Sequence, residues 1–307
     1  MDYQVILDEI YEEIAPELYD GKVADYIPAL ASVPRGSFAM TVTLEDGTSF
    51  SVGKSQKKFS IQSISKVFTF SHALNLYSKE LYKRIGVEPS GNSFNSLVQL
   101  EYENGIPRNP FINAGALVIT DILVSHYQDE FHALEMILSF VREIANNNTI
   151  TFDAEVARSE MEHGNRNIAL AHLMKSFGNF KNDIHQSVMT YFKHCAITMN
   201  TEELSRAMLF LAFGGRDPVT EKVFTTPSQA KRINAVMLTC GHYDASGEFA
   251  YHVGLPAKSG VGGGIVATVP GKMSISVWSP ALNKYGNSHA GTLALQMFTD
   301  KSGLSIF

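Results

Sequence analysis

The feature that most constrains the fold is the placement of strand-like segments at the two ends of the chain. Residues 37–44 alternate between apolar and small side chains, and residues 48–52 can return as a second strand after an Asp-Gly turn. Residues 264–269 and 273–278 flank a Pro-Gly dipeptide and have the pattern of a β-hairpin. Two hairpins so far apart in sequence bury their apolar faces most simply by joining one antiparallel sheet.

The long segment between the hairpins has a helical pattern, which begins at Ser63. Helices are predicted at 3–15, 114–127, 131–146, 166–175, 183–196, 201–213, 226–240 and 287–300. The expected fold is therefore α/β (α+β), an antiparallel sheet flanked by helices with an inserted helical lobe. We expect one domain, 1–307, with a sheet lobe of 1–70 plus 216–307, a helical lobe of 71–215 and the site between them.

Composition excludes several classes of protein. The formal net charge is −6 and no cluster of Lys and Arg occurs, which argues against a nucleic-acid-binding protein. Acidic residues occur early in the N-terminal segment and no apolar run reaches about 18 residues, so we expect a soluble, cytoplasmic protein without a membrane segment. Cys195 and Cys240 form neither a CxxC pair nor a disulfide framework, and both are expected to be buried thiols.

The first chemical motif is S-x-x-K, formed by Ser63 and Lys66 at the start of the helical pattern. Side chains three residues apart on a helix can meet, so the lysine can accept the serine proton if burial and the helix N-terminus lower its pKa from about 10.4. The same helix end offers backbone N–H groups to an oxyanion. The motif is short, and the alternative is an N-cap serine beside a surface lysine. No role is assigned to Ser65.

The second motif is K-S-G at residues 258–260, followed by a glycine-rich run that leads into the C-terminal hairpin. In penicillin-recognising serine enzymes, a K-T-G or K-S-G triad on a sheet edge faces the S-x-x-K serine. A dinucleotide-binding loop is the rival interpretation, but such a loop opens a helix and this one precedes a strand. The two motifs together favour a serine nucleophile.

Other chemistries have weaker support. No H-E-x-x-H motif occurs, and His163, His252 and His289 are expected to be core or surface residues rather than metal ligands. Glu160 and Glu162 resemble a glycosidase carboxylate pair, but two residues apart on a helix they would point to different faces. We therefore expect neither a metal nor a cofactor.

Taken together, the motifs resemble the serine-dependent bacterial glutaminases and the catalytic domain of animal glutaminases. The resemblance runs from about residue 20 to the end of the chain. It rests on 21–28 (GKVADYIP), 61–66 (IQSISK), 109–116 (NPFINAGA), 159–160 (SE), 165–167 (NRN) and 252–261 (HVGLPAKSGV). It implies a β-lactamase/transpeptidase-like fold, hydrolysis of L-glutamine to L-glutamate and ammonia without a cofactor, and a homo-oligomer, either a dimer or a tetramer.

The resemblance also implies roles for individual residues. Ser63 would attack the side-chain amide and form a glutamyl-enzyme, Lys66 would take its proton, and the backbone N–H groups of Ser63 and Val261 would hold the oxyanion. The implied catalytic set is Ser63, Lys66, Tyr191, Tyr243 and Lys258. The implied substrate-binding set is Tyr26, Ser63, Asn113, Glu160, Asn167, Tyr191, Tyr243 and Val261.

Physical chemistry agrees with these roles and leaves some alternatives open. Glu160 can bind the α-ammonium of glutamine, and asparagine and tyrosine side chains can donate to its α-carboxylate. Either Tyr191 or Tyr243 can pass a proton to the ammonia. Structural alternatives are an N-cap for Asn113, a turn for Asn167 and a core position for Tyr191. At the level of function, the alternatives are a penicillin-recognising hydrolase or transpeptidase and a non-catalytic glutamine sensor.

Overall fold

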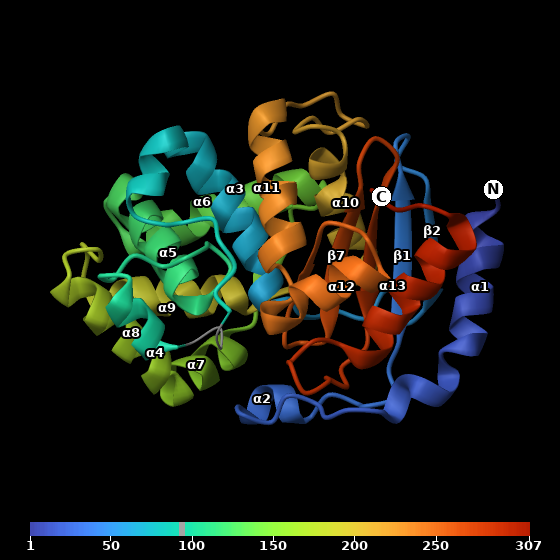
Figure 1. Cartoon of the computed structure of the whole chain (residues 1–307), viewed down its shortest axis with the longest axis horizontal. Helices are drawn as coiled ribbons and strands as arrows, with labels where there is room; N and C mark the ends of the chain where they lie inside the picture. The colour runs from blue at the N-terminus through green and yellow to red at the C-terminus, as the bar shows by residue number, and fades with distance from the viewer. Residues whose placement is uncertain (92–95) are drawn as a thin grey trace.

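The computed structural model describes residues 1–91 and 96–307 and is organised around one antiparallel sheet (Figure 1). The strand order is β2-β1-β8-β7-β6. The strands are β1 (Ala39–Leu44), β2 (Ser49–Gly53), β6 (Ala257–Ser259), β7 (Gly264–Val269) and β8 (Met273–Trp278). β1 of the N-terminal hairpin pairs with β8 of the C-terminal hairpin, which confirms the predicted joining of the two ends of the chain.

One face of this sheet packs against the helices at the two ends of the chain. α1 (Tyr3–Glu13) and α13 (His289–Ser302) cover the alternate apolar residues of β1, β7 and β8, among them Met40 and Ile275. Asp2 caps the first helix by accepting from the backbone N–H groups of Gln4 and Val5. Figure 1 shows both helices on the outer side of the sheet, at the end of the molecule opposite α5 to α9.

The other face of the sheet is buried beneath α10 (Thr201–Ala212), and hydroxyl groups of the strands form hydrogen bonds with this helix. The hydroxyls of Thr41 and Thr201 lie 2.9 Å apart, and Ser276 donates to the carbonyl of Thr201. The small polar side chains that alternate along the strands are therefore buried and hydrogen-bonded rather than solvated.

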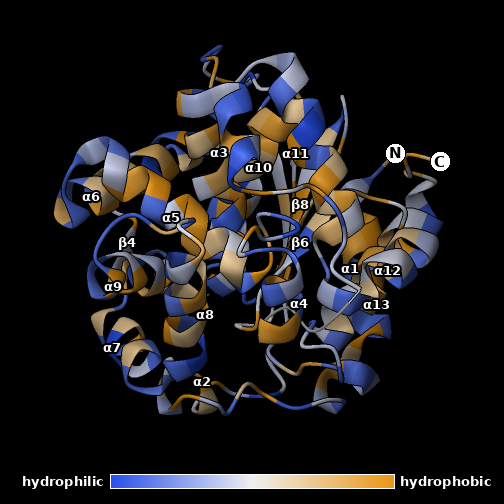
Figure 2. Cartoon of the chain, turned by 60° about the vertical axis from the view of Figure 1, so that its left-hand side comes forward, coloured by the Kyte–Doolittle hydropathy of each residue, from blue (hydrophilic) through white to orange (hydrophobic). Residues whose placement is uncertain are grey.

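A helical region lies beside the sheet, around α5 (Asn113–Tyr127). Residues 114–124 of this helix are all buried, and Figure 2 shows the helix in largely hydrophobic colours. The other helical segments are η1 (Ala15–Tyr19), α2 (Pro28–Ala31), η2 (Gln62–Ile64), α3 (Ser65–Tyr77), η3 (Ser78–Lys83), α4 (Leu97–Tyr102), α6 (Glu130–Ala145), α7 (Ala154–His163), α8 (Asn165–Ser176), α9 (Ile184–Cys195), α11 (Pro227–Cys240), η4 (Tyr243–Ala245) and α12 (Ser246–His252).

A second, small sheet joins the S-x-x-K segment to this helical region. Its strands, in the order β3-β5-β4, are β3 (Phe59–Ser60), β5 (Ile197–Met199) and β4 (Thr151–Phe152). They are too short to give an alternating pattern, so the sequence did not predict them. The backbone N–H of Ile61 donates to the carbonyl of Ile197, which holds the start of the motif against the chain that leaves α9.

The helix expected to begin at Ser63 begins two residues later. Gln62 has a left-handed backbone, with φ of +48°, so the chain first forms the 3-10 turn η2 and continues as α3 from Ser65. The lobe boundaries at residues 70/71 and 215/216 stay a prediction. Within the described part of the chain, no helix combines the length and the apolar character needed to cross a membrane.

Candidate active site

A cavity of about 360 Å³ opens where η2, α5, α7, α8, α9 and the turn between β6 and β7 meet. Eight of the residues predicted from the sequence line it: Tyr26, Ser63, Asn113, Glu160, Asn167, Tyr191, Tyr243 and Val261. Lys66 and Lys258 are fully buried and are not among the lining residues. The fold thus gathers side chains from segments that are far apart in the sequence.

Ser63 sits on the turn that precedes α3. Its side chain does not cap this helix, whose N-cap is Ile64, so the N-cap interpretation of Ser63 is wrong. The residue is 8% exposed, lines the cavity and interacts with the side chain of Tyr243, whose pKa it lowers. Its hydroxyl therefore faces the site rather than the helix backbone.

Lys66 lies one turn further along α3 and is buried completely. Its Nζ donates to Asn113 Oδ1 at 2.7 Å and to the carbonyl of Phe111 at 3.2 Å. Burial lowers the pKa of Lys66 to about 8, although nearby Cys195 and Glu160 act to raise it. About one tenth of Lys66 is therefore neutral at pH 7 and able to accept a proton, far more than for a lysine with the usual pKa of about 10.4.

Tyr243 and Lys258 form the opposite side of the site. Tyr243 has φ of +54°, and burial raises its pKa to about 12. Lys258 Nζ lies 4.6 Å from the centre of the Tyr243 ring and donates to the carbonyls of Gly241, at 3.0 Å, and Ser259. Burial, and then the charge of Lys66, lower the pKa of Lys258 well below its usual range. Lys258 thus ties the segment that carries Tyr243 to strand β6.

A carboxylate forms the charged part of the cavity wall. Tyr26 donates to Glu160 Oε1 at 2.6 Å, and Gln62 also hydrogen-bonds this carboxylate. Burial raises the pKa of Glu160, while these hydrogen bonds and the charge of Lys66 oppose the rise. Glu160 is buried and Glu162 exposed on α7, so the two carboxylates point to different faces, as the spacing predicted.

Two amides form the neutral part of the wall. Asn113 Nδ2 donates to Asn167 Oδ1 at 2.9 Å, while its own Oδ1 accepts from Lys66. The N-cap of α5 is Ile112, so the N-cap interpretation of Asn113 is wrong. Asn167 lies within α8 rather than in a turn. Both amides are joined to the buried lysine in one hydrogen-bonded chain.

The cavity has further lining residues that the sequence did not predict: Gln62, His163, Gly164, Arg166, Phe192 and Cys195. Gln62 precedes the predicted nucleophile, and Cys195 follows Tyr191 at helical spacing, so both carried a usable signal. His163, expected to be structural, lines the cavity while its Nδ1 lies 2.9 Å from the carbonyl of Ser159. Nothing in the sequence indicated that α7 would bring it there.

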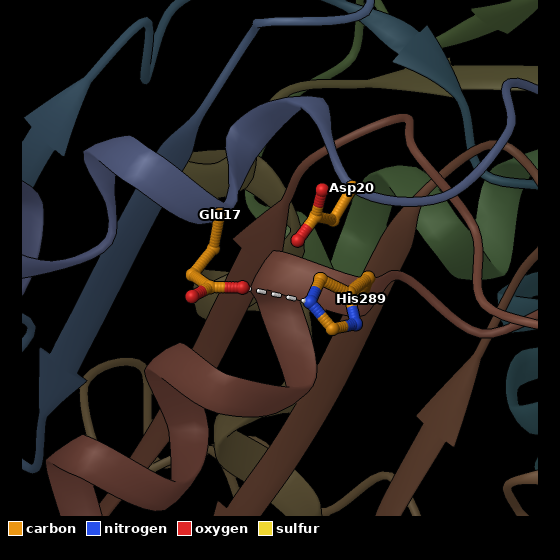
Figure 3. A group of neighbouring side chains, drawn as sticks. All are labelled: Glu17, Asp20 and His289. Carbon is orange, nitrogen blue, oxygen red and sulfur yellow. Dashed lines mark hydrogen bonds and ion pairs between the residues drawn. The ribbon is translucent and has the colours of Figure 1, made fainter.

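Among the described residues, one group of potential metal ligands lies outside this cavity (Figure 3). It consists of Glu17 in η1, Asp20 directly after η1 and His289 at the start of α13, with their ligand atoms within 4.8 Å of one another. His289 Nε2 and Glu17 Oε2 lie 3.0 Å apart and join the two elements. This contact gives His289, which was expected to be a core or surface residue rather than a metal ligand, a structural role.

Gly260 offers a test of how closely the K-S-G turn packs on the nucleophile. A Cβ at this position would lie 2.6 Å from the carbonyl oxygen of Ile61 and 3.3 Å from the backbone nitrogen of Ser63. Gly260→Ala is therefore expected to reduce kcat by about 10- to 100-fold by displacing Ser63. Gly247→Ala on α12 meets no atom within 4 Å and is the matched control, with kcat unchanged. Equal steady-state rates for the two variants would contradict this packing.

The site contains a serine and a buried lysine on one helical turn, which face a K-S-G edge strand across a cavity. This arrangement defines a serine hydrolase of the β-lactamase-like kind.

The glutaminase family model matches residues 21–307. A glutaminase from Aliarcobacter butzleri is 60% identical over 307 residues, which cover 100% of both chains. A Bacillus glutaminase structure has a TM-score of 0.92 at 34% identity and covers 100% of each chain. A Bacillus subtilis structure in complex with 6-diazo-5-oxo-L-norleucine has a TM-score of 0.90 at 34% identity, covering 100% of this chain and 98% of that one.

The chain belongs to the glutaminase family. Membership of this family makes it an enzyme, and its fold is the β-lactamase-like fold of that family. The fold and the class of activity expected from the sequence are thereby confirmed.

Proposed function

We propose that this chain hydrolyses L-glutamine to L-glutamate and ammonia through a glutamyl ester on Ser63. The observation that carries the proposal is the buried Lys66, whose pKa is about 8, one helical turn from a serine that lines the cavity. Neutral Lys66 takes the Ser63 proton as Oγ bonds to the side-chain carbonyl carbon of glutamine. The backbone N–H groups of Ser63 and Val261 then hold the oxyanion.

The two halves of the reaction balance around Lys66. When the tetrahedral intermediate collapses, the C–N bond breaks and the nitrogen receives the proton that Lys66 took from Ser63, so ammonia leaves, the ester remains and Lys66 is neutral again. Water then attacks the ester, its proton passes to Lys66, and Ser63 regains a proton as glutamate departs. The relay to the leaving nitrogen runs through Tyr243 or Tyr191, of which Tyr243 lies beside Ser63 and interacts with its side chain.

The cavity wall accounts for the choice of substrate. Glu160 is a buried carboxylate and pairs with the α-ammonium group through a charge-assisted hydrogen bond. Asn113, Asn167 and tyrosine hydroxyls of the wall hold the α-carboxylate without adding a charge. We assign Tyr26 to the orientation of Glu160, because its hydroxyl donates to that carboxylate.

Lys258 acts on the reaction through Tyr243. Its Nζ donates to the carbonyls of Gly241 and Ser259 and lies over the Tyr243 ring. These contacts support a positioning role, in which Lys258 holds Tyr243 in its left-handed conformation beside Ser63.

The pKa of Lys66 sets the expected pH dependence. Only the neutral amine can accept the serine proton, and burial lowers its pKa to about 8. The value of kcat/KM for glutamine should therefore rise from about pH 7 to about pH 9 and level off above the pKa of Lys66. A buffered series of initial rates measures this, and a flat profile from pH 6 to 9 would contradict Lys66 as the base.

Ammonia release from L-glutamine by the purified protein tests the reaction itself. We expect turnover of glutamine and much slower turnover of asparagine. The side-chain amide of asparagine is one methylene closer to the α-ammonium group that pairs with Glu160, so it does not reach Ser63 as well. A folded protein that instead hydrolyses a β-lactam would be a penicillin-recognising enzyme. Glutamine binding without turnover would make it a sensor.

The oligomeric state and the cellular location of the protein are two further properties that we propose. We propose a homo-oligomer, a dimer or a tetramer, because soluble enzymes often form symmetric assemblies and the family implies one. We also propose a cytoplasmic location. Light scattering on the protein as it elutes from a size-exclusion column measures the oligomeric state. Fractionation of cells measures the location.

A further inference from the structure

His194 is a fully buried residue that touches the motif of the nucleophile without lining the cavity. It is the penultimate residue of α9, and its ring lies between two hydroxyl groups. Nδ1 is 2.8 Å from Ser65 Oγ, and Nε2 is 3.0 Å from Thr120 Oγ1. The ring therefore links α9 to α3 and to α5.

The Ser65 hydroxyl continues this chain to the residue before the nucleophile. Ser65 Oγ donates to the carbonyl of Gln62 at 2.8 Å. Gln62 carries the left-handed backbone that turns the chain into η2 and directs Ser63 at the cavity. A left-handed conformation of a residue other than glycine persists only where its surroundings hold it.

The neutral ring has one donor and one acceptor, so the series of hydrogen bonds from Thr120 through His194 and Ser65 to Gln62 has a direction. Burial and the charge of Lys66 lower the pKa of His194 to about 3, so the ring is neutral at neutral pH. If Nδ1 carries the proton, it donates to Ser65 Oγ, and the Ser65 hydroxyl stays free to donate to Gln62. Thr120, whose Oγ1 also lies 2.9 Å from the carbonyl of Ala116, then donates its proton to Nε2 in place of that carbonyl. In the other tautomer the proton is on Nε2, and Nδ1 accepts from the Ser65 hydroxyl. The Gln62 carbonyl then loses its hydrogen bond from Ser65.

We propose that His194 is a positioning residue for the nucleophile: its Nδ1–H holds the Ser65 hydroxyl against the Gln62 carbonyl and so fixes the turn that presents Ser63. The inference rests on the proposed function, in which Ser63 is acylated. It also gives Ser65, which has no other part in the reaction, a specific role. The neutral ring adds no positive charge beside Lys66.

Two substitutions at position 194 test the hydrogen bonds of the two ring nitrogens separately. The amide of His194→Asn replaces Nδ1 and keeps a donor for Ser65, whereas the longer His194→Gln replaces Nε2 and keeps only the contact with Thr120. We expect the Gln variant to lose about 10- to 100-fold in kcat with KM within about threefold of the original value. The Asn variant should keep kcat within about threefold. Equal losses in the two variants, or a loss that resides in KM, would overturn the proposal.

A second measurement covers the case in which these variants fail to fold. Ser65→Ala removes only the hydroxyl and should reduce kcat by about tenfold. Adding His194→Gln to Ser65→Ala should then cause little further loss, because both remove the same hydrogen bond to Gln62. An Ser65→Ala enzyme with unchanged kcat would overturn the proposal. Absence of glutamine turnover in the unmodified protein would instead overturn the proposed function, so the two failures are distinguishable.

Discussion

Replacing Ser63 by alanine is expected to lower kcat for glutamine hydrolysis by about 10⁴-fold or more. The hydroxyl supplies the atom that bonds to the substrate, and no other described hydroxyl on the cavity wall is seated on the turn before α3. Folding should be little changed, because this hydroxyl does not cap the helix. Glutamine binding should persist in the variant and is measurable by calorimetry.

Ser71→Ala is the matched control for this substitution. Ser71 is a buried serine of the same helix whose Oγ donates to the carbonyl of Val67 at 2.7 Å. Its loss should cost about 1 kcal/mol of stability and leave kcat within about twofold. Retention of activity by Ser63→Ala, or an equal loss in both variants, would remove Ser63 from the mechanism.

Replacing Lys66 by methionine is expected to lower kcat by about 10²- to 10⁴-fold. Methionine fills nearly the same volume but cannot accept a proton, and it leaves Asn113 Oδ1 and the Phe111 carbonyl without their donor. The residual rate should no longer rise with pH near the pKa of Lys66, about 8. Both results come from initial rates across the pH series.

Lys79→Met is the control for general effects of removing a lysine, since Lys79 is exposed on η3. It should leave both kcat and the pH profile unchanged. A Lys66→Met enzyme that still showed the same rise of rate with pH would assign the titration to another group.

The sheet was predictable from the sequence because its strands are long enough to show a pattern. β1 and β8 alternate along six residues each, and both lie next to clear turn signals. The short strands β3 and β5 have two and three residues, and no periodicity can be read from so few positions. α7 was missed for a related reason: its sequence is rich in charged residues and has a weak apolar stripe.

The chemistry of the site was predictable only where it is local. Ser63 on η2 and Lys66 at the start of α3 are only three residues apart, so their spacing predicts that they can meet. Tyr26 and Glu160 are 134 residues apart, and only the resemblance to a family placed them together. The contact between Ser65 and His194 spans 129 residues and carries no motif, so it became visible only in the fold.

The left-handed conformation of Gln62 is a further feature that the sequence concealed. Glutamine has no preference for this region, and the residue adopts it because several contacts hold it there. Its side chain donates to Ser60 Oγ and also hydrogen-bonds Glu160, and its carbonyl accepts from Ser65. Tertiary contacts thus determine the backbone before the nucleophile.

Mass analysis of the enzyme during turnover tests the central claim most directly. The protein is mixed with excess L-glutamine, quenched in acid within the first turnovers and digested for peptide mapping. We expect a glutamyl group on Ser63 in the original enzyme and none in Ser63→Ala. Ammonia release at the full rate with no glutamyl group on Ser63, or with the group on another residue, would contradict it.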